Sequence, residues 1–318
     1  MLYFPQMYRG VFSAASGEIL VTQTGRGAHL SQLTWFDRNG KPAGTVGQPS
    51  WYGNVKLSPD GRRIATDQTD PEGSTDLWIQ DPTRDTTTRL TFDPGLDTNP
   101  VWSPDGKQIL FSSNRSQIFR AYLKNADGSG SEEEITSAGD TQFRALDWSH
   151  DGKYVLVQRN DALFYLTWPK RELQPLLETH GVVRGAQFSP DGRWVAYASN
   201  ESGSMEVYVS PFPGMTSKWQ VSSRGGEEPR WPQNGSELFY LSKDGELMAV
   251  KVTAASGFEA GSPVALFQTH RRQPVASYDL FSYAVSGDGN RFLIATKVED
   301  AKPAPLSVFL NWTAAIEK

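Results

Sequence analysis

A short turn motif that recurs along the whole chain constrains its fold more than any other feature. Three copies read Ser-Pro-Asp-Gly, and four further copies are degenerate. Their last residues are Gly17, Gly61, Gly106, Gly152, Gly192, Gly235 and Gly289, spaced 44, 45, 46, 40, 43 and 54 residues apart. A period of about 45 residues is typical of a β-propeller blade. The spacing therefore predicts one all-β propeller domain over residues 1–318.

Each repeat shows the same order of short strand-like stretches. A bulky apolar residue stands four positions before the glycine in six repeats: Leu57, Trp102, Trp148, Phe188, Trp231 and Val285. A run such as Ile64–Thr66 follows the glycine, and a second run such as Leu77–Ile79 comes later. Because Pro, Asp and Gly suit successive positions of a type I turn with a Gly bulge, the motif predicts a hairpin between the first two strands. We interpret its Asp residues as turn formers, not catalytic groups.

The number of blades follows from the number of motif copies. Seven glycines predict seven four-stranded blades, and six blades are the alternative because the copy at Gly17 is degenerate. The last repeat offers only three strand-like segments, while Leu2–Phe4 is spare at the other end of the chain. We expect this N-terminal strand to pair near Leu306–Asn311 and close the ring, because closure removes open sheet edges.

The repeats resemble the TolB-type, WD-related propeller repeat of bacteria. The stretches Phe188–Tyr197, Glu206–Gly214 and Lys218–Ser222 are also similar to propellers fused to the C-terminus of bacterial serine/threonine kinases. The resemblance implies an extracytoplasmic or periplasmic sensor or scaffold, and it assigns no catalytic residue. Residues 1–12 show no signal-peptide pattern.

Composition and motifs exclude several classes of function. The chain has no Cys, so it has neither a thiolate nucleophile nor a Cys-ligated metal site. A net charge of −5 argues against a nucleic-acid partner, which requires a basic face. No apolar run approaches the roughly 18 residues of a membrane helix, so we expect no membrane insertion by this chain. Neither a hydrolase nucleophile elbow nor a kinase motif occurs. We expect a monomer.

Polar residues just ahead of the first strand of each repeat predict a ligand site. In a propeller the innermost strands line the central channel, so these positions converge on one channel mouth. Seven positions before the glycine stand Asn54, Asn99 and Glu228, and one position earlier stand Arg144, Arg184 and Glu227. The loop residues His180 and Asp279 complete the predicted ligand-binding set.

These residue types leave two functions open. The first is a non-catalytic module that binds a protein segment or a small molecule at the channel face and requires no cofactor. Arg side chains there would suit an anionic ligand. The alternative is a calcium-dependent hydrolase, such as a lactonase or phosphotriesterase, in which Asn54, Asn99 and Glu228 hold Ca²⁺. The same polar groups also suit the hydration of a water-filled channel. Because no catalytic constellation stands out, we favour the binding module.

Overall fold

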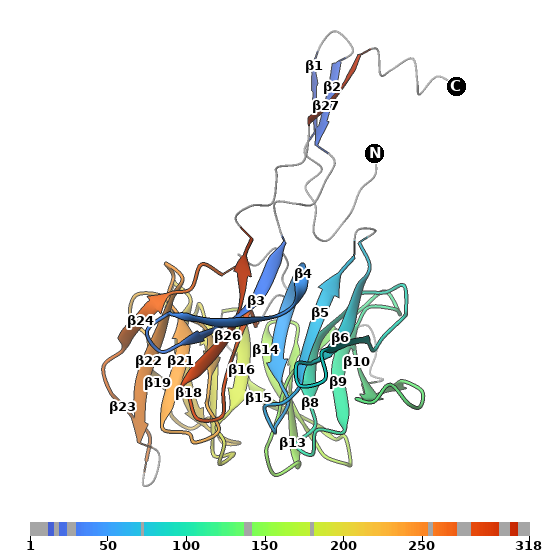
Figure 1. Cartoon of the computed structure of the whole chain (residues 1–318). Coiled ribbons are helices and arrows are strands. Elements are labelled where there is room, and N and C mark those ends of the chain that lie inside the picture. Colours follow the sequence, from blue (N-terminus) through green and yellow to red (C-terminus); the bar gives the residue numbers. More distant parts are fainter. Residues whose placement is uncertain are drawn as a thin grey trace.

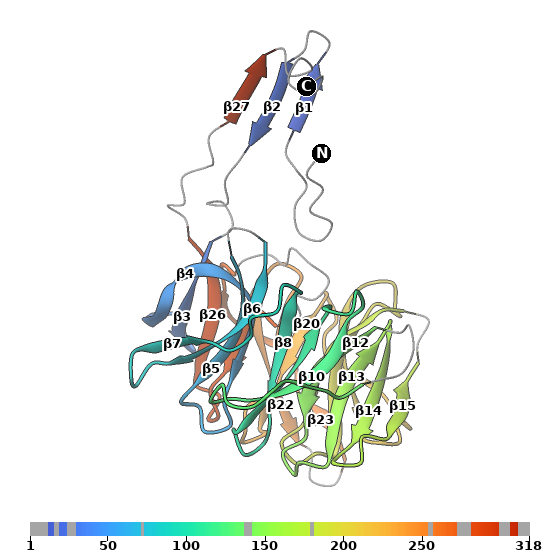
Figure 2. The same cartoon turned by 90° about the vertical axis from the view of Figure 1, so that its right-hand side faces the viewer.

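The part of the chain that the structure describes is built from β-strands. The computed structural model describes residues 12–15, 19–23, 30–70, 73–136, 142–178, 181–253, 257–271, 281–298 and 306–310. These residues form antiparallel strands joined by turns and loops, mostly arranged around a common axis (Figures 1 and 2). In the described part, no helix has the length and apolar character that a membrane crossing needs. The predicted all-β propeller is confirmed.

Within the described residues, six four-stranded antiparallel units surround the axis, and we number these blades 1 to 6. Blade 1 contains the second half of β4 (Pro42–Leu57), β5 (Ile64–Thr69), β6 (Thr75–Asp81) and β7 (Thr86–Arg89). Blade 2 contains β8 (Asp97–Trp102), β9 (Gln108–Ser113), β10 (Arg120–Asn125) and β11 (Glu133–Glu134). Blade 3 contains β12 (Phe143–Trp148), β13 (Tyr154–Arg159), β14 (Ala162–Thr167) and β15 (Leu173–Leu177).

The remaining blades follow the same order from the axis outward. Blade 4 contains β16 (Val183–Phe188), β17 (Trp194–Ser199), β18 (Glu206–Pro211) and β19 (Trp219–Gln220). Blade 5 contains β20 (Glu227–Arg230), β21 (Glu237–Leu241), β22 (Glu246–Thr253) and β24 (Val264–Gln268), and β23 (Glu259–Ala260) pairs with the end of β22. Blade 6 contains β25 (Tyr283–Val285), β26 (Arg291–Lys297), β3 (Ser31–Asp37) and the first half of β4.

Blade 6 closes the ring because it combines strands from distant parts of the sequence. β26 pairs with β3 over seven residues, from Arg291↔Asp37 to Lys297↔Ser31, and both views show the two strands side by side (Figures 1 and 2). Closure by an N-terminal strand is therefore found, but the strand is β3. The predicted closing segment Leu2–Phe4 lies outside the described residues.

The predicted seventh blade is not formed by the described residues. β1 (Phe12–Ala15) and β2 (Ile19–Gln23) pair as a hairpin, and β27 (Leu306–Leu310) adds to the other side of β2. Both figures draw this three-stranded sheet apart from the blades. The copy at Gly17 has neither the Pro nor the Asp of the motif. Of the strands on either side of it, β2 pairs with β27, the last described strand, so the ring of the described residues has six blades.

The repeated motif forms the predicted hairpin turns. In blade 2, the Ser103 hydroxyl donates to Asp105 Oδ1 at 2.6 Å and accepts the Gln108 N–H at 2.9 Å. The Lys107 N–H donates to the same Asp105 oxygen at 3.0 Å, and Gly106 has a φ of +68°. The hydrogen bond from Ser103 is the largest cause that lowers the pKa of Asp105. These carboxylates are therefore part of the turn.

The bulky residue four positions before each glycine packs between neighbouring blades. Trp102 is 6% exposed and belongs to one apolar cluster with Leu77 of blade 1 and Ile109 of blade 2. Its Nε1 donates to the Lys56 carbonyl at 3.2 Å, which adds a polar link between the two blades. The Arg63 guanidinium lies 4.7 Å from its ring centroid. Trp102 therefore fastens blade 2 to blade 1.

We predict that Trp102→Ala lowers the free energy of unfolding by about 3–5 kcal/mol, as large-to-small changes in a packed core do. The matched control is Phe92→Ala, because Phe92 is 67% exposed and its loss should change stability by about 0.5 kcal/mol or less. Urea denaturation followed by tryptophan fluorescence measures both variants. Equal losses in the two variants would contradict the packing described.

Candidate functional site

The predicted positions seven before each glycine lie at a bulge in the inner strands. The pairing of the inner strand with its neighbour shifts register there in five blades. Asn99, Gly185 and Glu228 have left-handed φ values of +54°, +59° and +52°. Bulges re-aim side chains, and a left-handed Glu persists only where its surroundings hold it in place. These positions therefore have a special geometry, which their contacts explain.

Asn54 and Asn99 meet at a carboxylate that sequence reasoning missed, that of Asp67 on β5. Asn54 donates to Asp67 through its backbone N–H at 2.7 Å and its side-chain amide at 2.6 Å. The Asn99 N–H donates to the same carboxylate at 3.1 Å. Asn54 Oδ1 accepts the Phe281 N–H at 3.0 Å. The cluster thus links blade 1 to blades 2 and 6. The only sequence signal for Asp67 was a charged residue within the strand Ile64–Thr69.

Glu228 belongs to a different cluster. Its buried carboxylate accepts hydrogen bonds from the Ser282 N–H at 2.6 Å and from Arg271 Nη1 at 3.0 Å. Burial raises the pKa of Glu228, and the charge of Arg271 opposes that rise. In the described part of the chain, no three His, Asp or Glu side chains are grouped as metal ligands. The calcium site on Asn54, Asn99 and Glu228 stays a prediction.

The other predicted site residues do not share one set of contacts. Glu227 Oε2 lies 3.9 Å from Arg271 Nη2, next to the Glu228 cluster. The Arg144 guanidinium lies 5.5 Å from the ring centroid of Phe119, and Arg184 is exposed. His180 and Asp279 lie outside the described residues.

A cavity of about 140 Å³ lies at the opposite end of the inner strands, on the face that carries the motif hairpins. Every blade contributes the residues five and four positions before its motif glycine. The first set is Lys56, Val101, Asp147, Gln187, Arg230 and Ala284, and the second is Leu57, Trp102, Trp148, Phe188, Trp231 and Val285. Hairpin residues form the rim, among them Pro59, Pro104, His150, Pro190 and Gln233. We call this space the hairpin-face cavity.

Two cations and one carboxylate line the hairpin-face cavity. Lys56 Nζ donates to the Leu146 carbonyl at 3.2 Å and lies 3.8 Å from Asp147 Oδ1. Burial, and secondarily the charge of Arg230, lowers the pKa of Lys56 to about 7. Burial likewise lowers the pKa of Arg230 to about 10 and raises that of Asp147. The cavity therefore holds its charges at a high desolvation cost.

Both cations rest on one aromatic ring. Lys56 Nζ lies 4.0 Å and the Arg230 guanidinium carbon 3.5 Å from the ring centroid of Phe281, which is fully buried. Phe281 belongs to blade 6, and its apolar cluster includes Leu146 of blade 3 and Ala186 of blade 4. An aromatic side chain thus packs across the axis beneath the charged groups.

The same ring of positions also joins neighbouring blades. Asp147 Oδ2 accepts the Phe188 N–H at 2.9 Å, and Gln187 Oε1 accepts the Trp231 N–H at 2.9 Å. Sequence reasoning missed these residues because it looked seven and eight positions before the glycine. One sequence signal for these residues was available. Lys56, Asp147, Gln187 and Arg230 stand at the same repeat position, directly before the bulky residue of a predicted core strand.

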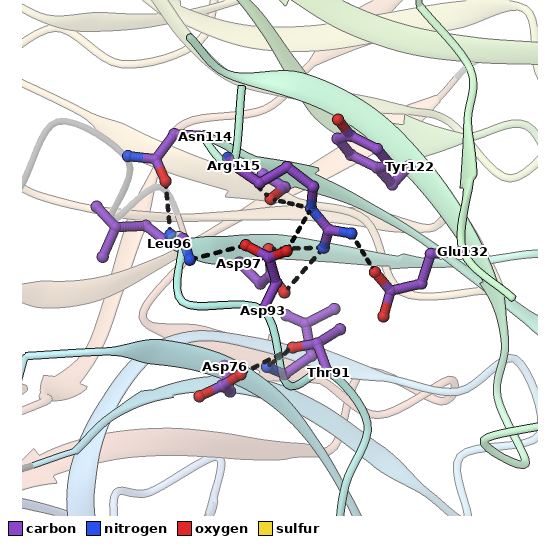
Figure 3. Close-up of polar contacts among 12 residues, drawn as sticks. Asp76, Thr91, Asp93, Leu96, Asp97, Asn114, Arg115, Tyr122 and Glu132 are labelled. Carbon is purple, nitrogen blue, oxygen red and sulfur yellow. Dashed lines mark hydrogen bonds and ion pairs between the residues drawn. The ribbon is translucent and has the colours of Figure 1, made fainter. Parts of the chain in front are cut away.

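A second charged cluster lies in blade 2, and its groups pair with one another. Figure 3 shows the Arg115 guanidinium among three carboxylates. Its ion-pair partners are Asp93 at 3.8 Å, Asp97 at 3.2 Å and Glu132. Burial raises the pKa of Asp97 to about 6, although Ser113 and Arg115 oppose the rise. These ion pairs stabilise blade 2, and the cluster is not proposed as a ligand site.

Comparison with known proteins agrees with this architecture. Residues 38–170 match the family described as TolB beta propeller domain. The Tol-Pal system protein TolB of Helicobacter pylori is 28% identical over 153 residues, which cover 46% of this chain and 36% of that protein. The match thus spans about a third of the length of this curated relative.

Solved structures show the same fold. The putative TolB from Agrobacterium tumefaciens has a TM-score of 0.62 at 17% identity, covering 85% of this chain and 99% of that one. TolB from Acinetobacter baumannii has a TM-score of 0.52 at 15% identity, covering 93% and 80%. Together, the fold and the repeat define a β-propeller. More particularly, residues 38–170 are similar to the TolB beta propeller domain.

We predict that Lys56 makes the stability of the fold depend on pH above neutrality. Its pKa is about 7 in the folded chain against 10.5 as the ordinary value, so between these pH values the unfolded chain binds more protons. The free energy of unfolding should therefore rise with pH across this window, and Lys56→Met should remove that rise. Urea denaturation at pH 7.5 and 9.5 measures it. The exposed control Lys170→Met should retain the wild-type dependence; an unchanged rise in Lys56→Met would contradict the burial of the charge.

Proposed function

We propose that this chain is a non-catalytic protein-binding propeller that acts on the extracytoplasmic side of a bacterial envelope, in a system like the Tol-Pal system. The observation that carries the proposal is the hairpin-face cavity, to which every blade of a TolB-like ring contributes. The curated relative is named a Tol-Pal system protein, which supports a role in assembly with other proteins. The partner docks on the hairpin face and inserts a side chain into the cavity.

The walls of the cavity suit such a role. Binding sites for inserted groups are lined by apolar and aromatic side chains, with a few placed polar groups that fix orientation. Here Trp102, Trp148 and Trp231 form part of the wall, and Lys56 and Arg230 supply the charges. The links between blades hold this wall in place, so a partner loses little free energy in ordering it.

The proposal is tested by photo-crosslinking in living cells of the bacterium that encodes the protein. A photoreactive phenylalanine replaces His150, which is exposed on the rim of the cavity. The control replaces Ser202, which is exposed in the turn after β17, on the opposite face of the ring.

We expect a discrete protein adduct from position 150 and none from position 202. Adducts at both positions in equal amount, or at neither, would overturn the assignment of the hairpin face as the docking surface.

A further inference from the structure

We propose that the hairpin-face cavity binds the carboxylate of an acidic side chain, Asp or Glu, from a docked peptide segment, between Lys56 and Arg230. This inference rests on the proposed function, because it names the chemistry by which the docked partner is recognised. Hydrogen-bond donors, charge and access from the rim each favour such a ligand.

The wall of the cavity carries hydrogen-bond donors on Arg230 and Lys56. Arg230 is 3% exposed, and it uses Nε on the Tyr283 carbonyl at 3.3 Å and Nη1 on the Pro229 carbonyl at 3.3 Å. Its Nη2 is buried, and no acceptor among the described residues lies within hydrogen-bond reach. The Lys56 ammonium has three donors, and one of them reaches the Leu146 carbonyl. Two blades thus present donors that an incoming acceptor would satisfy.

The charges at the cavity also favour an acidic ligand. Lys56 and Arg230 face the same Phe281 ring. The face of the ring attracts cations, but a phenyl ring has no oxygen or nitrogen to accept their hydrogen bonds. The carboxylate of Asp147 lies 3.8 Å from Lys56 and is also held by the Phe188 N–H. Glu228 also attracts Arg230, but its carboxylate is paired with Arg271 at 3.0 Å. Asp147 is therefore the carboxylate left to oppose these two cations in a buried place. A second carboxylate would balance the charge where the local dielectric makes each ion pair strong.

A ligand reaches the cavity from the hairpin face. The cavity opens among the hairpins, where the exposed His150 stands on the rim. Gln233 of blade 5 donates through Nε2 to the Pro59 carbonyl of blade 1 at 2.5 Å, so it bridges part of the rim. A cavity of about 140 Å³ has room for a side chain but not for a folded domain. An acidic side chain on an extended segment fits this geometry.

The test uses the capped tripeptide acetyl-Gly-Glu-Gly-amide and its Gln counterpart, which has the same shape without the charge. The tryptophan residues of the wall report binding by fluorescence titration. The measurement is made at pH 6, below the pKa of about 7 of Lys56, so that both cations are charged. We expect the Glu peptide to bind at least tenfold more tightly than the Gln peptide, as a charge-assisted hydrogen bond predicts.

Three variants sharpen the test. Lys56→Met keeps the length of the side chain and should weaken binding of the Glu peptide about tenfold, with no effect on the Gln peptide. Asp147→Asn keeps an acceptor for the Phe188 N–H but removes the competing charge, so it should tighten binding of the Glu peptide severalfold. Lys170→Met, an exposed control, should change neither. Thermal melting establishes that each variant is folded.

The outcomes separate the two proposals. Equal binding of the two peptides, or weaker binding of the Glu peptide by Asp147→Asn, would overturn the carboxylate site while adducts from position 150 still support protein docking. Selective binding of the Glu peptide without adducts from position 150 would support the carboxylate site and overturn docking of a protein partner on this face.

Discussion

The pairing of β26 with β3 is the interaction on which the ring depends. Each of the other blades is a local hairpin array whose strands are neighbours in sequence, so each can form by itself. Blade 6 can form only when residues 31–50 and 283–297 meet, which costs loop-closure entropy over most of the chain. Once it forms, the inner strands have neighbours on both sides, and the axial positions of all six blades converge.

That convergence explains why buried polar side chains connect neighbouring blades near the axis. Asn54, Asp67 and Glu228 make hydrogen bonds from one blade to the next, where apolar contacts alone would leave the rotation of a blade poorly specified. Lys56 and Arg230 differ from these groups, because both cations lie on one aromatic ring and Arg230 Nη2 has no acceptor among the described residues. Buried charge of this kind lowers stability and is expected where it serves recognition.

The sequence predicted the blades well because the Ser-Pro-Asp-Gly turn is local chemistry that repeats in phase. The ligand set was harder to predict, since Asn99 and Glu228 lie at bulges whose left-handed backbone no spacing rule reveals. Lys56 and Arg230 share one repeat position, yet only the closed ring places both on Phe281. The strands on either side of the copy at Gly17 lie in a separate three-stranded sheet, because a hairpin pattern alone cannot say which strand its edge will pair with.

The position of the seam has a mechanical consequence. The chain enters the ring at Ser31 and leaves it at Lys297, and these two residues are paired at the same end of the seam. A force that separates them breaks the hydrogen bonds between β3 and β26 one after another, starting at this end. It does not load all of them at once. The pairing of β2 with β27 lies in series with the seam. Tension on the two ends would separate β2 from β27 before it reaches the hydrogen bonds that close the ring.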